Sequence, residues 1–156
     1  MLLSIAGVFL LSNLILNVHK ANTERMLSIY TSESVIDASG LAQSILDEIQ
    51  TKAFDENTTT SAVSDTDSLT SANNLGPDTG EVLNTSFDDI DDYNNFTTSI
   101  VLDRMGTFDI KVTVTYVNTL SPQTTSSSPT FCKHVQVALT NYSLLDTLKF
   151  DHIIAY

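Results

Sequence analysis

The chain has 156 residues, which allows one modest globular domain beside a long helix. Its 19 acidic and 7 basic residues give a formal net charge of -12, which argues against nucleic-acid binding, because phosphate backbones are bound by clustered Lys and Arg. The single cysteine, Cys132, excludes an intramolecular disulfide, so packing or assembly must provide the stability.

The chain begins with an apolar stretch from Met1 to Val18 that contains no charged residue, histidine or proline. A run of this length is nearly long enough to cross a bilayer or to fill the core of a helical bundle. A cleaved signal peptide is disfavoured, because no basic n-region and no small-residue cleavage site is visible before Ala21. A membrane anchor and a helix that packs against copies of itself are both compatible with the stretch.

The pattern from His19 to Phe54 predicts that the same helix continues, with apolar residues at three- and four-residue spacing. At about 1.5 Å per residue, a helix over 1–54 would be on the order of 80 Å long, which is more than a small domain covers. Something outside the chain must therefore bury its first part. The predicted apolar stripe consists of Leu27, Tyr30, Ile36, Ala38, Leu41, Ala42, Ile45, Ile49 and Ala53.

The segment after the helix divides into a loop and a turn. Residues 55–85 lose all periodicity and are rich in Thr, Ser, Asp and Asn, which predicts a long surface loop. In residues 86–96 the spacing of the apolar side chains predicts a short helical turn that is pinned to the core. These side chains are Phe87, Ile90, Tyr93 and Phe96.

After residue 96 the period of the apolar residues changes to two, which predicts β-strands. Apolar and polar residues alternate in 98–104, 107–117 and 131–142, and the apolar segment 144–156 closes the chain. The polar segment 121–129, which is bounded by two prolines, is interpreted as a loop.

The predicted fold class is α+β, with a long N-terminal helix over 1–54 and a β-rich head domain over 55–156. One face of the four-stranded antiparallel sheet needs a cover, and the amphipathic second part of the helix provides one. Two strands each place one set of residues on a common face: Phe108, Ile110, Val112, Val114 and Tyr116 in the first, and Lys133, Val135, Val137 and Leu139 in the second.

The order of these elements resembles that of the type IV pilin and pseudopilin family. Residues 87–96 (FDDIDDYNNF), 111–117 (KVTVTYV), 133–139 (KHVQVAL) and the closing apolar strand are similar in order to bacterial pilin-like proteins with an FDD-x-DDYN segment before paired VTV-type strands. The resemblance covers essentially the whole chain. It implies that a prepilin peptidase leaves a processed end at or near Met1, and that a pilus assembly machinery takes the subunit from the inner membrane.

The sequence departs from the standard pilin pattern near both ends. Most such pilins carry a glutamate at the fifth mature position, where this chain has Ile5, and no proline lies near position 22. The frequent C-terminal disulfide loop is also missing. These departures fit the broader superfamily, in which minor pilins and secretion pseudopilins at a filament tip can lack the glutamate.

We interpret the apolar stretch as the part of the helix that packs in a filament. Asn13 and Asn17 lie on one helical face and predict a polar seam, in which amide hydrogen bonds between neighbouring helices set their register. The residues predicted to form the assembly core are Leu2, Leu3, Ile5, Val8, Phe9, Leu11, Leu14, Ile15 and Val18.

Four aspartates in the turn segment, Asp88, Asp89, Asp91 and Asp92, offer the hard oxygen ligands that Ca²⁺ takes. They predict a candidate calcium site, and no other cofactor is expected. The alternative is a solvated acidic turn in which the aspartates cap backbone NH groups.

Cys132 and His134 share a strand face but are too few for a four-ligand metal site, so we expect them to pack. The sequence contains no glycine-rich phosphate loop and no evident Ser, His and acid arrangement. We therefore expect a protein that is not an enzyme.

Together these observations predict a structural subunit that self-assembles through its N-terminal helix into an extracellular type IV pilus-like filament on the cell surface. Cell adhesion, surface motility, DNA capture and secretion are all roles of such filaments. Two alternatives stay open. The first is a minor pilin or secretion pseudopilin, and the second is a single-pass membrane-anchored extracytoplasmic binding domain.

Overall fold

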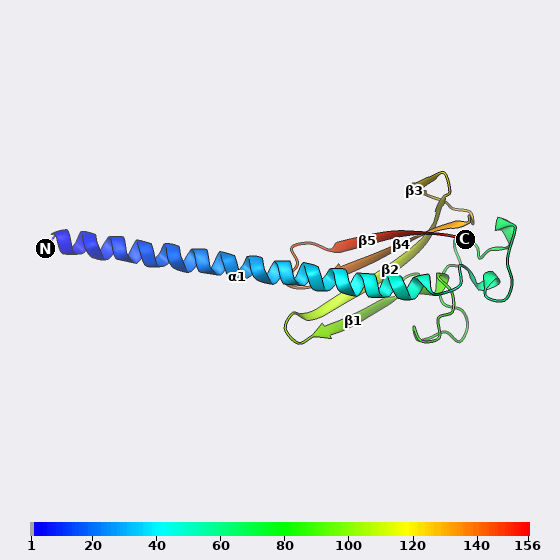
Figure 1. The fold of residues 1–156 in the computed structure, drawn as a ribbon, viewed down its shortest axis with the longest axis horizontal. Coiled ribbons are helices and arrows are strands. Elements are labelled where there is room, and N and C mark those ends of the chain that lie inside the picture. The colour runs from blue at the N-terminus through cyan, green and yellow to red at the C-terminus, as the bar shows by residue number, and fades with distance from the viewer. Residues whose placement is uncertain (1) are drawn as a thin grey trace.

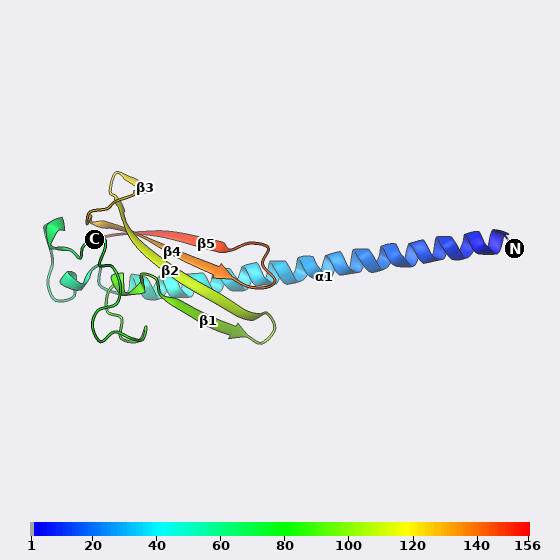
Figure 2. The same ribbon diagram turned by 180° about the vertical axis from the view of Figure 1, so that it is seen from behind.

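The computed structural model describes residues 2–156, with side chains described from residue 7 onward. Its longest element is the helix α1 (Leu2–Gln50), whose C-terminal part lies along a β-sheet. The N-terminal part of α1 extends far beyond the sheet (Figure 1 and Figure 2). The molecule is therefore elongated, with the N-terminal end of α1 at one extremity and the C-terminus in the head domain.

The head domain is built on an antiparallel sheet of five strands with the order β1-β2-β4-β5, while β3 pairs separately with β2. The long helix and the antiparallel sheet confirm the predicted α+β class, and the number of strands corrects the predicted four to five. The strands are β1 (Thr97–Leu102), β2 (Gly106–Asn118), β3 (Ser121–Thr125), β4 (Cys132–Thr140) and β5 (Leu148–Ala155).

The additional strand, β3, lies in the polar segment that we predicted to be a loop. It folds back on the end of β2, with Val117 opposite Thr125 and Asn118 opposite Ser121. Its side chains are exposed or half-buried, so the segment carries no period-two hydrophobic pattern that would predict a strand. Pro122 is tolerated there because an edge strand need not donate every backbone hydrogen bond.

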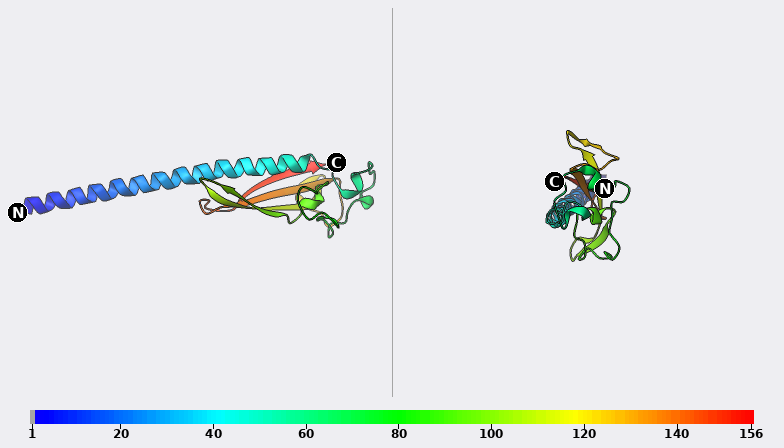
Figure 3. Two further views of the ribbon diagram at one scale, coloured as in Figure 1. Left: turned by 90° about the horizontal axis from the view of Figure 1, so that it is seen from below. Right: turned by 90° about the vertical axis from the view of Figure 1, so that its right-hand side faces the viewer.

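The C-terminal part of α1 covers one face of the sheet, as Figure 3 shows from below. Its buried residues recur at nearly every fourth position: Ser34, Ala38, Ala42, Leu46 and Ile49. Because the first three are small, the helix backbone lies close to the strands. The sheet side of this core consists of Phe108, Ile110, Val112, Val114, Tyr116, Val135, Val137 and Leu139, each at most 2% exposed.

The predicted apolar stripe of the helix is only partly correct. Leu27 and Ile36 are 61% and 70% exposed, whereas Leu46, which the prediction omitted, is buried. Leu27 precedes Ser34, which is the first buried residue of α1 among the side chains that the structure describes. Ile36 lies two positions after the buried Ser34, so it points to a different side of the helix.

The helix also ends earlier than predicted, at Gln50 and not at Phe54. Beyond a turn, the Asp88 carbonyl accepts a hydrogen bond from the Ala53 amide, and the Ala53 carbonyl accepts one from the Ile90 amide, both at 3.0 Å. This parallel bridge joins Ala53 to the turn segment 86–96, which we call the acidic segment, and it replaces the last helical turn. The helical spacing of Ala53 alone gives no sign of it.

Between α1 and the sheet the chain forms short 3-10 turns. The loop over 55–85 contains η1 (Glu56–Thr58) and η2 (Thr66–Ser68), and the acidic segment contains η3 (Asp91–Tyr93) at the predicted helical turn. Three aromatic rings of that turn pack edge to face, with centroid separations of 5.0 to 5.9 Å. They belong to Phe87, Tyr93 and Phe96.

Because α1 lies so close to the sheet, we expect larger side chains at this interface to destabilise the protein. Replacing Ala42, which is 0% exposed, by leucine should lower the free energy of unfolding by about 1–3 kcal/mol, because the extra methyl groups overpack the interface. Denaturant unfolding of the full chain measures this change. The matched control is Ser44→Leu on the exposed side of the helix, which should stay within about 0.5 kcal/mol of the original chain. Equal effects of both changes would contradict the packing.

Candidate functional site

The N-terminal part of α1 presents large apolar side chains to solvent. Eight of them between Val8 and Val18 are 53% to 68% exposed. They occur at consecutive as well as at spaced positions, so they surround the helix and do not form one stripe. We call them the apolar surface of α1: Val8, Phe9, Leu10, Leu11, Leu14, Ile15, Leu16 and Val18.

The apolar surface contains most of the residues predicted to form the assembly core. Of that set, the side chains of Leu2, Leu3 and Ile5 lie outside the part that the structure describes. The six others are exposed, and Leu10 and Leu16 join them although the prediction did not name them. Within the described residues, no helix has an apolar stretch of the length needed to cross a membrane.

The two asparagines of the predicted polar seam lie within the apolar surface. Both Asn13 and Asn17 are exposed. The Asn13 side-chain amide donates a hydrogen bond of 2.9 Å to the Phe9 carbonyl one turn earlier. This bond uses one donor and leaves the side-chain carbonyl available to a neighbouring helix. The seam stays a prediction.

Polar pairs begin immediately after the apolar surface. Lys20 and Glu24 form an exposed ion pair of 3.9 Å at the spacing that favours such pairs on a helix. Farther along, Arg104 in the β1–β2 turn pairs with Glu33 of α1. This contact ties the hairpin to the helix near the start of the sheet.

The acidic segment is a second candidate site, and it is not the solvated turn that we considered. Asp89, Asp91 and Asp92 are only 1% to 2% exposed. The Asp89 carboxylate accepts hydrogen bonds from the amides of residues 91 and 92, and the Asp92 carboxylate accepts from the amides of residues 88 and 89. The predicted capping is thus present, but inside the protein.

Burial and mutual repulsion shift the acidity of this segment. Burial raises the pKa of Asp89 to about 8, and the charges of Asp91 and Asp92 add to the shift. Burial likewise raises the pKa of Asp92 to about 6, with Glu81 opposing its ionisation. The pKa of Asp91 rises to about 7, because burial outweighs the attraction of Lys133.

These raised pKa values predict an unusual pH dependence. The folded protein holds protons that the unfolded chain, with aspartate pKa values near 3.8, has already released. The protonated carboxyl groups therefore stabilise the folded protein fully below about pH 4, and this stabilisation is lost as the pH rises through 6 and 8. We expect a smaller free energy of unfolding at about pH 8 than at about pH 5, measured by denaturant unfolding in a chelator.

The control for this pH dependence is Asp89→Asn. An asparagine keeps the oxygen that accepts from the amides of residues 91 and 92, but it does not titrate. The variant should therefore lose less stability between the two pH values. A stability that is constant or rises toward pH 8 in the original chain would contradict the assigned shifts.

Two groups of carboxylates come close enough to share a cation. One group contains Glu56, Asp88 and Asp89, and the other contains Glu81, Asp88 and Asp92. Asp91 also belongs to the predicted calcium site, but its carboxylate pairs with Lys133. The calcium site stays a prediction, and its ligands among the aspartates would be Asp88, Asp89 and Asp92.

Lys133 is the centre of an arrangement that the sequence analysis did not identify. Its side chain is 0% exposed, and its Nζ donates to Asp55 Oδ2 at 3.2 Å, to the Phe54 carbonyl at 2.5 Å and to Asp91 Oδ1. We call Lys133, Asp55 and Asp91 the ionic centre. A signal was available, because Lys133 alternates in phase with the buried Val135 and Val137.

Within the ionic centre, the Asp55 carboxylate accepts several hydrogen bonds. Besides Lys133, it accepts hydrogen bonds from the Tyr116 hydroxyl at 2.9 Å and from the Thr70 amide and hydroxyl at 3.0 to 3.2 Å. Burial alone would raise the pKa of Asp55, but Lys133, Tyr116 and backbone amides hold it below the ordinary value. Asp55 is therefore the ionised partner of Lys133.

Cys132 and His134 lie on the face of β4 opposite Lys133. Cys132 is 4% exposed and is a free thiol. The His134 Nε2 lies 2.8 Å from Asp151 Oδ1 of β5, and Gln136 donates to the same oxygen. Cys132 therefore packs as expected, whereas His134 forms a cross-strand pair with Asp151.

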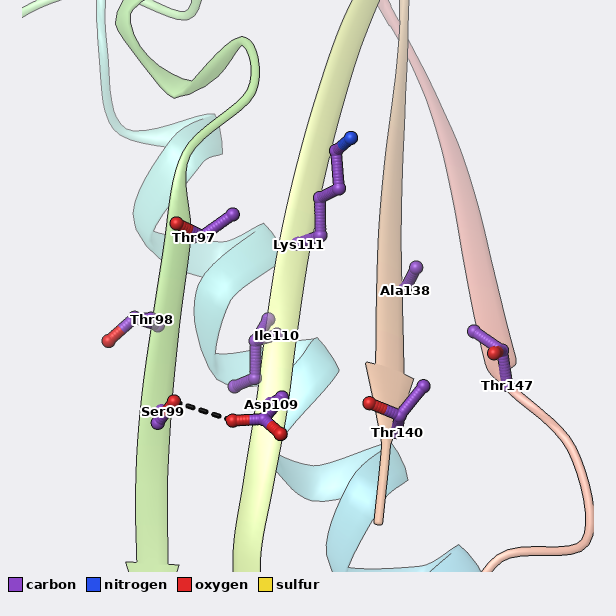
Figure 4. A pocket seen from close by; sticks show the side chains of 9 residues that line it. All are labelled: Thr97, Thr98, Ser99, Asp109, Ile110, Lys111, Ala138, Thr140 and Thr147. Carbon is purple, nitrogen blue, oxygen red and sulfur yellow. Dashed lines mark hydrogen bonds between the residues drawn. The ribbon is translucent and has the colours of Figure 1, made fainter.

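A shallow hollow of about 400 Å³ lies on the side of the sheet opposite α1. Figure 4 shows its lining residues on β1, β2, β4 and immediately before β5, with the helix behind the sheet. The Ser99 hydroxyl donates to Asp109 Oδ1 at 2.6 Å across β1 and β2. Five of its nine lining residues are serine or threonine, as is typical of the solvent-facing side of an antiparallel sheet.

Comparison with protein-family models, with characterised proteins and with solved structures finds no match for this chain. Two features of the chain itself bear on its function. One is the apolar surface of α1, and the other is the buried acidic segment with its ionic centre.

Proposed function

We propose that this chain is the structural subunit of a type IV pilus-like filament, in which the α1 helices of many copies pack together along the axis. One observation carries the proposal: each of the eight large side chains that form the apolar surface of α1 is more than half exposed in the isolated chain. Soluble monomers rarely display a contiguous apolar surface of this kind. Burial against other apolar side chains stabilises such a surface, and copies of the same helix supply these side chains.

The energetics favour association of the preformed helix. Completing the burial of each side chain of the apolar surface contributes on the order of 1 kcal/mol. Eight such side chains offset much of the entropic cost of fixing a subunit in an assembly. Because these side chains surround the helix, one subunit has contacts to offer to several neighbours. A filament uses all of these contacts, whereas a simple dimer leaves some exposed.

The head domain suits the outer wall of such a filament. In the elongated molecule it lies at the end of α1 opposite the apolar surface (Figure 1). The chain carries a formal charge of -12, and like charge on the outer surfaces keeps separate filaments from adhering. The proposal includes a stay in the inner membrane before assembly and an extracellular, cell-surface location afterwards.

The test is electron microscopy of material sheared from cells that produce the full chain, with mass spectrometry of the same fraction. Thin uniform filaments with this chain as the main component are the expected result. A chain that is only a trace component would make it a minor pilin or pseudopilin. A chain that stays in the membrane fraction without filaments would overturn the proposal in favour of an anchored binding domain.

A further inference from the structure

The ionic centre brings a primary amine and two carboxyl groups together out of contact with water. Lys133 comes from β4, Asp91 begins η3, and Asp55 precedes η1. The side chains of Lys133 and Asp55 are 0% exposed and that of Asp91 is 3% exposed. The Lys133 Nζ also lies 4.3 Å from the centroid of the Phe54 ring and 5.0 Å from that of Tyr116.

Each carboxyl group has a distinct position relative to the amine. Asp55 receives a hydrogen bond from Nζ and is held in place by the Tyr116 hydroxyl. Asp91 contacts Nζ through Oδ1 only. Its Oδ2 is buried and has no hydrogen-bond partner among the described residues. An amine, a proton acceptor and a carboxyl group with one oxygen left unbound are the components of an amide-forming reaction.

We propose that Lys133 and Asp91 form an intramolecular isopeptide bond between Nζ and Cγ, with Asp55 as the catalytic base. One proton of the Lys133 ammonium passes to Asp55, which frees the electron pair on Nζ. That pair attacks Cγ of the neutral Asp91 carboxyl group, while Oδ1 stays as the carbonyl oxygen. The Cγ–Oδ2 bond breaks, and Oδ2 leaves as water with its own proton and a second proton from Nζ.

The surroundings favour this reaction in three ways. A buried ammonium and a buried carboxylate each carry a desolvation cost, and the neutral amide removes both charges. Fixed neighbours react as if at effective concentrations on the order of 10⁵ to 10⁸ M. The aromatic rings beside Nζ exclude bulk water, which keeps the amine and the carboxyl groups desolvated. No oxidant or co-reactant is needed, because the only by-product is water.

The bond would tie the central strand β4 to the acidic segment that pairs with the chain beyond α1. A cross-link of this kind restricts the unfolded chain as a disulfide does, in a protein whose single cysteine cannot form one internally. The inference goes beyond the proposed filament, since it concerns the head domain of each subunit alone.

Mass spectrometry of the full chain, purified folded in detergent, tests the bond directly. The intact mass should be lower than that of the encoded chain by one water molecule. Trypsin should fail to cleave after Lys133, so that peptide 53–104 is recovered joined to peptide 112–149. Fragment ions should place the link on Asp91. Filament formation does not enter this measurement, so its failure and that of the proposed function are distinguishable.

The other outcomes overturn the inference. If folded protein has the full mass of the encoded chain and trypsin cleaves it after Lys133, the bond is excluded. A lost water without joined peptides indicates a cyclised aspartate instead, and a link on Asp55 removes Asp91 from the assigned role. In Asp55→Asn, which keeps an oxygen for the Tyr116 hydroxyl, the joined peptide should fall at least tenfold while circular dichroism shows a folded chain. An undiminished joined peptide there would refute Asp55 as the base.

Discussion

Filaments should be lost when Val8 is replaced by aspartate, while the head domain stays folded. Val8 is 66% exposed and belongs to the apolar surface of α1. In the proposed assembly its side chain is buried among apolar neighbours, where an unpaired carboxylate costs several kcal/mol. Every subunit would carry that cost, so assembly should fall below detection in sheared fractions viewed by electron microscopy.

The matched control for Val8→Asp is Leu120→Asp. Leu120 is 93% exposed between β2 and β3 in the head domain, so the control places the same charge at an apolar, solvent-facing position. It should leave filaments normal in number and diameter. Circular dichroism of both variants should match that of the original chain. Abundant filaments from Val8→Asp, or equal losses from both variants, would refute the role of the apolar surface.

The second large effect is expected at Lys133. Replacing it by methionine keeps much of the side-chain volume but leaves the Asp55 carboxylate buried without its cation. Removing one partner of a buried ion pair is worth about 3–5 kcal/mol, which is a large share of the stability of a small domain. We expect a loss of about this size in denaturant unfolding at about pH 7, whether Lys133 acts as the cation of the pair or as the amide of the proposed bond.

Lys149→Met provides the comparison for Lys133→Met. Lys149 lies exposed on β5, opposite Ala138 of β4. The same change of residue type at this surface position should alter the free energy of unfolding by no more than about 0.5 kcal/mol. If Lys133→Met were as stable as Lys149→Met, the ionic centre would not support the head domain.

The helix and the main strands were predictable because each carries a strong hydrophobic period. The apolar start of the chain leads into helical spacing, and residues 108–116 alternate strictly, so the buried face of β2 follows directly. The end of the helix was not predictable in this way. It depends on the bridge between Ala53 and Asp89, which joins two segments through backbone groups that carry no side-chain pattern.

The acidic segment shows why a candidate site is harder to predict than a fold. Four aspartates within five residues predict a solvent-exposed charged surface, because runs of like charge are usually solvated. Three of the four are nevertheless buried. Their burial depends on backbone amides within the turn and on Lys133, which is distant in the sequence. The alternation in β4 already placed Lys133 with apolar residues, and a buried lysine requires an acidic partner. The sequence therefore contained a signal for a buried ion pair at Lys133.

The most direct measurement is a helical reconstruction of the filaments by electron cryomicroscopy. We expect residues 8–18 of α1 to lie at the filament axis, in contact with the same residues of neighbouring subunits, while the head domains form the outer wall. A filament in which this part of α1 is exposed, or one held together by the head domains alone, would contradict the central claim.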